Sequence, residues 1–156
     1  MNNNEYFLSD AIDVIQEVLN TGGEFRMYPK GTSMRPLLMQ GQDSVVLEKK
    51  DPDLLKKHDV IFYRRENGQF VLHRIMKVCR EGTFVLCGDN QTLLEKDVRK
   101  EQVIGYVSKI YKGDQLLSTT SFSHRMYMRF WMWMPYRRLV FFIRRGFRFL
   151  KRCFKK

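Results

Sequence analysis

The first twenty residues have the spacing typical of an amphipathic helix. Apolar side chains recur there every three or four positions, at Leu8, Ile12, Ile15 and Leu19. Acidic and amide residues occupy the opposite side of this predicted helix. We expect a short helix that Ser9 caps and that Gly22-Gly23 ends, because a serine oxygen accepts from the free N–H groups at a helix start and glycine stops helices.

A pattern typical of β-strands runs from residue 24 to about residue 111. Six short runs rich in β-forming residues are separated by polar turns: Glu24 to Tyr28, Ser44 to Glu48, Val60 to Arg64, Gln69 to Cys79, Thr83 to Cys87 and Val103 to Tyr111. Asn67-Gly68 and Glu81-Gly82 lie between runs and suit tight hairpin turns. The pattern therefore predicts a mainly β fold behind one leading helix.

Residues 137–156 predict a second amphipathic helix, with a basic face. At about 100° per residue their Arg and Lys side chains fall within an arc of roughly 140°, and every apolar side chain except Phe141 falls opposite. Pro135 separates this helix from a segment of aromatic residues that favour lipid headgroups: Tyr127, Phe130, Trp131 and Trp133. We expect this tail to lie along an anionic membrane surface rather than to cross the bilayer.

The net charge of +11 belongs entirely to the tail. Residues 1–123 contain 17 Lys and Arg against 17 Asp and Glu, whereas residues 124–156 contain eleven Lys and Arg and no acid. Charge therefore says nothing about the partners of the front part. Docking on its own domain is an alternative for the tail. Nucleic-acid binding is the least favoured, because it explains the charge but not the broad apolar face.

These patterns divide the chain into four parts. We expect an N-terminal helix over 1–23, a β domain over 24–112, a polar linker over 113–123 and the basic aromatic tail over 124–156. The three cysteines are odd in number and form no CxxC pair, so neither a disulfide framework nor a metal site is expected, and no cofactor. Without a basic start or an uninterrupted apolar run, the first twenty residues predict neither a signal peptide nor a membrane span.

Candidate chemistry begins at Ser33, in the segment Gly31-Thr32-Ser33-Met34-Arg35-Pro36. Gly31 can adopt backbone angles closed to other residues, and Pro36 fixes its own φ, so the segment predicts a tight bend. A serine hydroxyl is a weak nucleophile until a neighbouring base takes its proton. A nucleophilic role for Ser33 therefore requires a base from elsewhere in the chain.

His73 is the candidate base, and three carboxylates that follow it could orient its ring. It lies directly behind the turn at 67–68, in a run of β-formers whose rigidity suits a general base, although a lone strand histidine is more often structural. Asp89 lies in Gly-Asp-Asn, which is equally typical of a simple turn. Glu95 and Asp97 are equally consistent with solvated surface charges, but an imidazole base needs such an acceptor on its far nitrogen.

The order of these segments resembles the signal peptidase I family and its self-cleaving repressor relatives. The resemblance rests on Ser-Met-x-Pro, His-Asp-Val-Ile-Phe-Tyr, Val-Leu-His-Arg-Ile, Gly-Asp-Asn and Val-Ile-Gly-Tyr-Val, and it covers about Lys30 to Ile110. Bacterial housekeeping members carry a lysine base, whereas the endoplasmic-reticulum, archaeal and sporulation types carry histidine. His73 at this position implies the serine–histidine branch.

The resemblance implies a role for each candidate residue. Ser33 would be the nucleophile and His73 the general base, with Asp89 as the first family aspartate. Asp97 is the preferred second aspartate that orients the base, and Glu95 is its rival because the spacing is longer in this chain than in the family pattern.

The oxyanion hole departs from the family pattern. Some lysine-type members have a hydroxyl residue two positions before the nucleophile, where this chain has Gly31. The backbone N–H of Ser33 would then carry the oxyanion, with Gly31 allowing close approach of the substrate and the Thr32 hydroxyl as a less favoured helper. Met34 would line the pocket for the residue before the scissile bond, or belong to the core.

The expected function is that of a serine endopeptidase. The resemblance implies that it binds a peptide or preprotein as an extended strand and cleaves a leader or signal segment through an acyl-enzyme. A catalytically inactive peptide-binding or membrane-assembly protein of the same fold is the alternative. A self-cleaving repressor is less favoured, because the stretch before Gly31 is too short for a DNA-binding domain. We expect peripheral association with the cytoplasmic face of a membrane.

Overall fold

The computed structural model describes residues 3–117 and, of the remainder, 122, 126–131, 133, 135, 137 and 139–143. For residues 3–10 only the backbone is described. The chain divides into two compact units, Met1–Leu117 and Ser118–Lys156. Each unit is therefore considered by itself.

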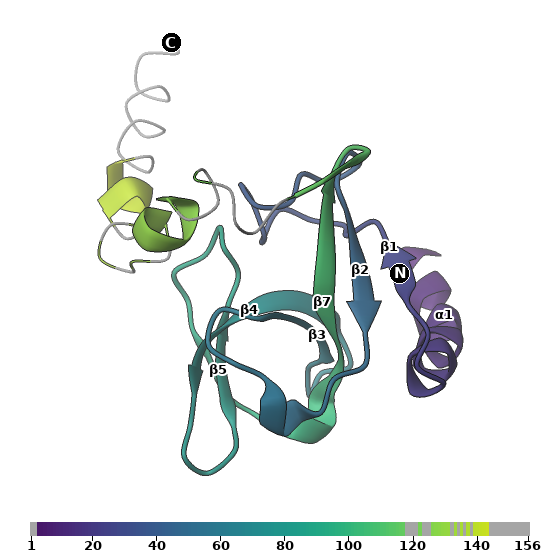
Figure 1. Ribbon diagram of the computed structural model, residues 1–156. Helices are drawn as coiled ribbons and strands as arrows, with labels where there is room; N and C mark the ends of the chain where they lie inside the picture. Colours follow the sequence, from purple (N-terminus) through teal and green to yellow (C-terminus); the bar gives the residue numbers. More distant parts are fainter. Residues whose placement is uncertain are drawn as a thin grey trace. The chain divides into compact units, whose positions relative to one another are not determined.

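The first unit is built on one antiparallel sheet, so the prediction of a mainly β fold is confirmed (Figure 1). Its strands are β1 (Phe25–Met27), β2 (Ser44–Glu48), β3 (Val60–Arg64), β4 (Phe70–Val78), β5 (Phe84–Cys87), β6 (Glu95–Val98), β7 (Val103–Lys112) and β8 (Gln115–Leu116). Their order is β1-β2-β7-β3-β4-β5-β6, with β8 beside β7. Short 3-10 turns, η1 (Pro52–Leu54) and η2 (Lys100–Gln102), precede β3 and β7.

Most strands lie where the sequence predicts them, and two were not predicted. β2 and β3 have the predicted bounds, and the hairpin turns at 67–68 and 81–82 join β3 to β4 and β4 to β5. The short edge strand β6 was missed because its sequence, Glu-Lys-Asp-Val, is mostly charged. β8 falls inside the segment interpreted as a linker, where it pairs with the end of β7.

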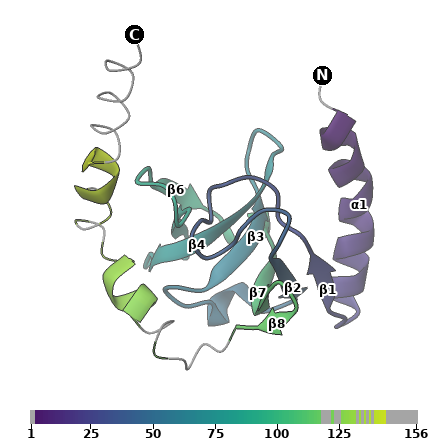
Figure 2. The ribbon, with the colours of Figure 1, turned by 90° about the horizontal axis from the view of Figure 1, so that it is seen from above.

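Helix α1 spans Asn3–Asn20 and packs beside β1 (Figure 2). Ile12, Ile15 and Leu19 are buried, as their spacing predicts. The expected capping role of Ser9 is wrong, because the helix begins six residues earlier and Ser9 lies inside it. Gly22, with φ of +80°, follows the helix, and Gly23 donates to the Val18 carbonyl at 2.9 Å, so the predicted stop is confirmed.

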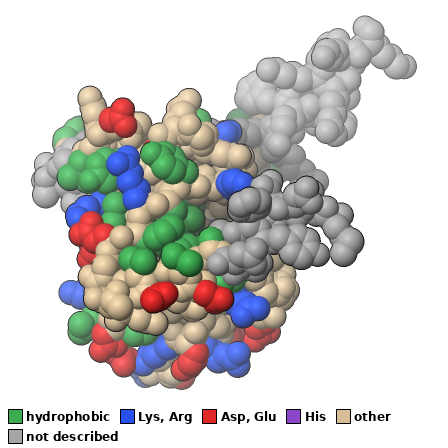
Figure 3. All heavy atoms as spheres, turned by 90° about the vertical axis from the view of Figure 1, so that its right-hand side faces the viewer, with side chains coloured by type: hydrophobic (Ala, Val, Ile, Leu, Met, Phe, Trp, Pro, Cys, Tyr) green, Lys and Arg blue, Asp and Glu red, His purple; other side chains and the backbone are tan. Residues whose placement is uncertain are grey.

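A buried cluster fills the curled end of the sheet formed by β3 to β6 and holds the strands that carry the candidate site. Its members are Leu55, Ile61, Tyr63, Ile75, Phe84, Leu86 and Val98. Acidic and basic side chains are intermixed on the face that Figure 3 shows. This mixture agrees with the charge balance of residues 1–123.

The second unit is described only in part. A π-helical turn, η3, spans Tyr127–Trp131, and residues 139–143 are helical. The rest of the amphipathic helix predicted over 137–156 lies largely outside the described residues. Several described apolar side chains of this unit are exposed: Phe122, Met126, Phe130, Trp133, Leu139, Phe142 and Ile143. Within the described ranges, every helix is too short or too polar to cross a membrane.

Candidate active site

The Ser33 bend is fixed by its apolar neighbours and by a chain of hydrogen bonds. Met34, Leu37 and Leu38 are buried and anchor the segment in the core. Gly31 adopts the left-handed region, with φ of +91°, and its N–H donates to Oε1 of Gln40 at 3.0 Å. The backbone amide of Gly31 is therefore engaged within the loop.

The loop after Ser33 is tied to the end of β7 by a partly buried ion pair. Nζ of Lys112 lies 2.6 Å from Oδ2 of Asp43 and also donates to the Leu37 carbonyl at 2.8 Å. The same carboxylate oxygen accepts from the Met39 N–H at 2.6 Å. Burial works to raise the pKa of Asp43, but these donors outweigh it and hold that pKa below its ordinary value. The charged pair thus fixes the loop.

His73 lies on β4, opposite Ile61 of β3, and its side chain is 1% exposed. Its Nδ1 is 3.0 Å from Oε1 of Glu95 and 3.3 Å from the hydroxyl oxygen of Tyr63. The Tyr63 hydroxyl donates its only proton to Oε2 of Glu95 at 2.6 Å. Both neighbours of Nδ1 are therefore acceptors, which assigns the ring proton to Nδ1 and leaves Nε2 with a lone pair.

Glu95 is held on the histidine by three donors. Arg65 binds both carboxylate oxygens, through Nε to Oε2 at 2.8 Å and through Nη2 to Oε1, and the Tyr63 hydroxyl adds a third bond. Gln69 accepts from Nη1 of Arg65 at 3.0 Å. Burial works to raise the pKa of Glu95, but the bonds from Arg65 and Tyr63 outweigh it and lower that pKa. Glu95 is consequently a fixed carboxylate.

The imidazole of His73 is neutral over the physiological range. Burial lowers its pKa to about 4, and the Arg65 charge acts in the same direction, whereas the Glu95 carboxylate works against them. A histidine acts as a general base only while neutral, so Nε2 is able to accept a proton at neutral pH.

The Gly-Asp-Asn turn after β5 joins the Ser33 bend to His73. Asn90 donates from its N–H to the Ser33 carbonyl at 2.6 Å and from Nδ2 to the Thr32 carbonyl at 3.1 Å. At Gly88 an added Cβ would lie 2.7 Å from the Ser33 carbonyl oxygen and 3.0 Å from Nε2 of His73. Glycine is therefore required for this close approach, which places Nε2 beside the serine segment.

Asp89 anchors the same turn rather than the histidine. Its two oxygens accept from Nε and Nη2 of Arg74 at 2.9 and 2.8 Å, and both side chains are buried. Nη1 of Arg74 donates in turn to the His58 carbonyl at 2.7 Å. A paired, bidentate geometry of this kind offsets the cost of burying the charges and fixes the position of the turn.

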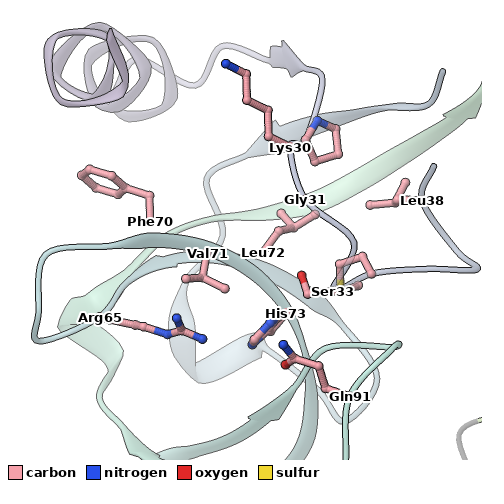
Figure 4. Close-up of a pocket in the computed structure, with 12 residues that line it drawn as sticks. Lys30, Gly31, Ser33, Leu38, Arg65, Phe70, Val71, Leu72, His73 and Gln91 are labelled. Atoms are coloured by element: carbon pink, nitrogen blue, oxygen red, sulfur yellow. The ribbon is translucent and has the colours of Figure 1, made fainter. Parts of the chain in front are cut away.

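A cleft of about 230 Å³ brings Ser33 and His73 together (Figure 4). Met34, Leu38, Phe70, Val71 and Leu72 form its apolar wall, and Gln91 lies beside the imidazole. Ser33 and His73 are both described, and the Ser33 hydroxyl forms no hydrogen bond with Nε2 of His73. Such bonds are often long in unliganded enzymes and shorten when substrate binds.

The structure places Glu95, and not the Asp97 preferred from the sequence, against the histidine. Asp97 is exposed and has a φ of +57°, at an irregularity in the β5–β6 pairing where Phe84 faces Val98 and Leu86 faces Glu95. The rival, Glu95, contacts His73. Asp89 is likewise placed on Arg74 and not on the imidazole ring.

Two of the three other predicted residues line the cleft, and Thr32 lies outside its lining. Gly31 and Met34 line it, and Met34 is also buried. Thr32 is exposed and contributes its carbonyl to the bond with Asn90.

Sequence reasoning missed Tyr63 and Arg65. Tyr63 lies on β3 two residues after Ile61, the partner of His73, and Arg65 directly follows the strand, two residues after Tyr63. This alternation was the one available signal, because residues i, i+2 and i+4 of a strand share a face.

Comparisons of the chain with protein-family models, curated proteins and solved structures find no match.

Proposed function

We propose that this protein is a serine endopeptidase of the signal peptidase type, with Ser33 as nucleophile and His73 as general base. The observation that carries the proposal is one cleft that holds a serine and a neutral histidine whose far nitrogen is bound to a fixed carboxylate. Serine, base and orienting acid are the three parts of a catalytic triad, which performs acyl transfer to a serine.

The reaction follows from these positions. Nε2 of His73 takes the proton of the Ser33 hydroxyl while the oxygen attacks a peptide carbonyl carbon, and the Ser33 N–H donates to the resulting oxyanion. The imidazolium, stabilised by Glu95, then returns the proton to the leaving amine as the C–N bond breaks. Water, deprotonated by the same nitrogen, then attacks the ester carbon; the bond to the Ser33 oxygen breaks, and Nε2 returns the proton to that oxygen and restores the hydroxyl.

The wall of the cleft is suited to an extended peptide. β5 pairs with β4 only from Arg74 onward, while the cleft is lined by the preceding residues Phe70, Val71 and Leu72. Within the described part of the chain, no strand pairs with this part of β4 on the side away from β3, and an extended peptide can pair with it there. A leader or signal segment of a peptide or preprotein is the substrate class that the sequence resemblance implies.

The second unit is proposed to hold the enzyme on an anionic membrane surface. The exposed aromatic and aliphatic side chains of this unit supply apolar area, and the eleven basic residues of 124–156 supply charge. Each basic residue near such a surface contributes about 1 kcal/mol.

A fluorophosphonate probe tests the catalytic assignment. The full-length protein is expected to gain the mass of the probe at Ser33 and to cleave model leader peptides, whereas Ser33→Ala does neither. Ser44→Ala is the matched control, because Ser44 is a buried β2 serine outside the cleft. Peptide binding without labelling of Ser33 would favour the inactive peptide-binding alternative.

Vesicle flotation tests the membrane assignment. The protein is expected to float with vesicles that contain phosphatidylserine, to stay in solution with phosphatidylcholine alone, and to dissociate at high salt. Equal binding to both kinds of vesicle would contradict an electrostatic surface mode.

A further inference from the structure

Arg65 binds the carboxylate of Glu95, which contacts His73. A carboxylate beside an imidazole ordinarily raises the pKa of the ring, because its negative charge favours the protonated form. In this site the guanidinium of Arg65 binds both oxygens of that carboxylate. The negative charge that faces His73 is thus matched by a positive charge on its other side.

We propose that Arg65 is a positioning residue that holds the Glu95 carboxylate against Nδ1 of His73 and offsets the negative charge that this carboxylate presents to the ring. This inference rests on the proposed function, in which His73 is the base. The effect of Arg65 on the pKa of His73 can nevertheless be measured without any catalytic turnover.

The geometry supports both parts of this role. Arg65 reaches Glu95 from the end of β3 across to β6, and its Nη1 is fixed in turn by Gln69 at 3.0 Å. In Figure 4 the Arg65 side chain extends toward His73 from the far side of the cleft. A planar guanidinium fixes a carboxylate at two points, which a lysine ammonium cannot do.

The remaining groups that act on His73 do not replace Arg65. Tyr63 of β3 donates its hydroxyl proton to Glu95. Burial raises the pKa of the Tyr63 hydroxyl, so this group is neutral. Asp89, in the turn after β5, acts to raise the pKa of His73, but its charge is paired with Arg74. Removing Arg65 therefore leaves Glu95 as the dominant charge at the ring.

Titration of the His73 ring by NMR tests the proposal without any substrate. In the full-length Arg65→Gln variant, the pKa of His73 is expected to rise by about one pH unit or more. Arg64→Gln is the matched control, because Arg64 is the neighbouring exposed residue, placed over the Phe70 ring, and it should leave the titration unchanged. An unchanged or lowered pKa in folded Arg65→Gln overturns the proposal.

Glu95→Gln provides an opposite test and serves if Arg65→Gln does not fold. It removes the negative charge and leaves the positive one, so the pKa of His73 should fall, and a rise would overturn the proposal. In the active enzyme, Arg65→Gln should move the acidic limb of kcat/KM upward in parallel with the NMR titration. If the pKa moves while Ser33 proves unreactive, the peptidase assignment fails and the role of Arg65 stands.

Discussion

Nδ1 of His73 lies 3.0 Å from Oε1 of Glu95, and no comparable contact joins the histidine to Asp97. Glu95→Gln is therefore expected to lower kcat by roughly 10²- to 10⁴-fold, because an amide in place of the carboxylate no longer stabilises the imidazolium or its tautomer. Asp97→Asn should leave kcat within about twofold of the wild type, since exposed charges away from the site have small effects. The measurement is kcat for steady-state cleavage of one leader peptide by each variant. A larger loss of kcat in Asp97→Asn than in Glu95→Gln would assign the orienting role to Asp97.

The acidic limb of the activity profile is expected at low pH. Because burial lowers the pKa of His73 to about 4 from an ordinary 6.5, the base remains neutral as pH falls through 6 and 5, and kcat/KM declines only near pH 4. The measurement is kcat/KM from pH 3.5 to 8, with circular dichroism at each pH to verify that the protein is folded. A midpoint near 6.5 in folded protein would contradict the lowering of the His73 pKa by burial.

Gly88→Ala should disable the site through a steric effect alone. The added Cβ meets the Ser33 carbonyl oxygen at 2.7 Å and Nε2 of His73 at 3.0 Å, so the relative position of these two residues must change. A misplacement of about 1 Å can cost roughly 10²-fold in rate, which sets the expected loss in fluorophosphonate labelling. Gly113→Ala is the control, since an added Cβ there has no atom within 4 Å and only backbone strain results. Full labelling of Gly88→Ala would show that the turn does not position Ser33.

The Arg74–Asp89 pair is expected to govern stability. Arg74→Met leaves a buried carboxylate without its bidentate partner and should lower the free energy of unfolding by about 3–5 kcal/mol. Lys50→Met, which breaks the more exposed pair with Asp59, should cost less than about 1 kcal/mol. Urea unfolding measures both changes. The double variant Arg74→Met/Asp89→Leu should recover much of the loss, and no recovery would point to a role beyond charge pairing.

The sequence predicts the sheet well because its strands obey local rules. β2 and β3 are short apolar runs bounded by turn residues, and the turn at 67–68 sets the register that places His73 opposite Ile61. The serine and the histidine could be singled out from the same local patterns.

The carboxylate that contacts His73 could not be predicted by local rules. β6 has no alternating apolar pattern, and it joins the sheet because Val98 packs into the core while Glu95 meets Arg65, thirty positions away. The left-handed backbone at Asp97 then turns that carboxylate outward, although Glu95 and Asp97 share the same strand parity. Whether Glu95 or Asp97 contacts His73 thus depends on the Arg65–Glu95 ion pair and on the irregularity of β6 at Asp97.

The bond from the Asn90 N–H to the Ser33 carbonyl also has a consequence for the order in which the molecule is made. A growing chain carries Ser33 long before it carries the turn that fixes the bend or the Glu95 carboxylate on β6 that contacts His73. A ribosome-bound fragment that ends before residue 90 therefore holds Ser33 without the hydrogen bond from Asn90. Under the proposed function, hydrolytic competence is a late property of the fold, because it requires β6 to be paired with β5.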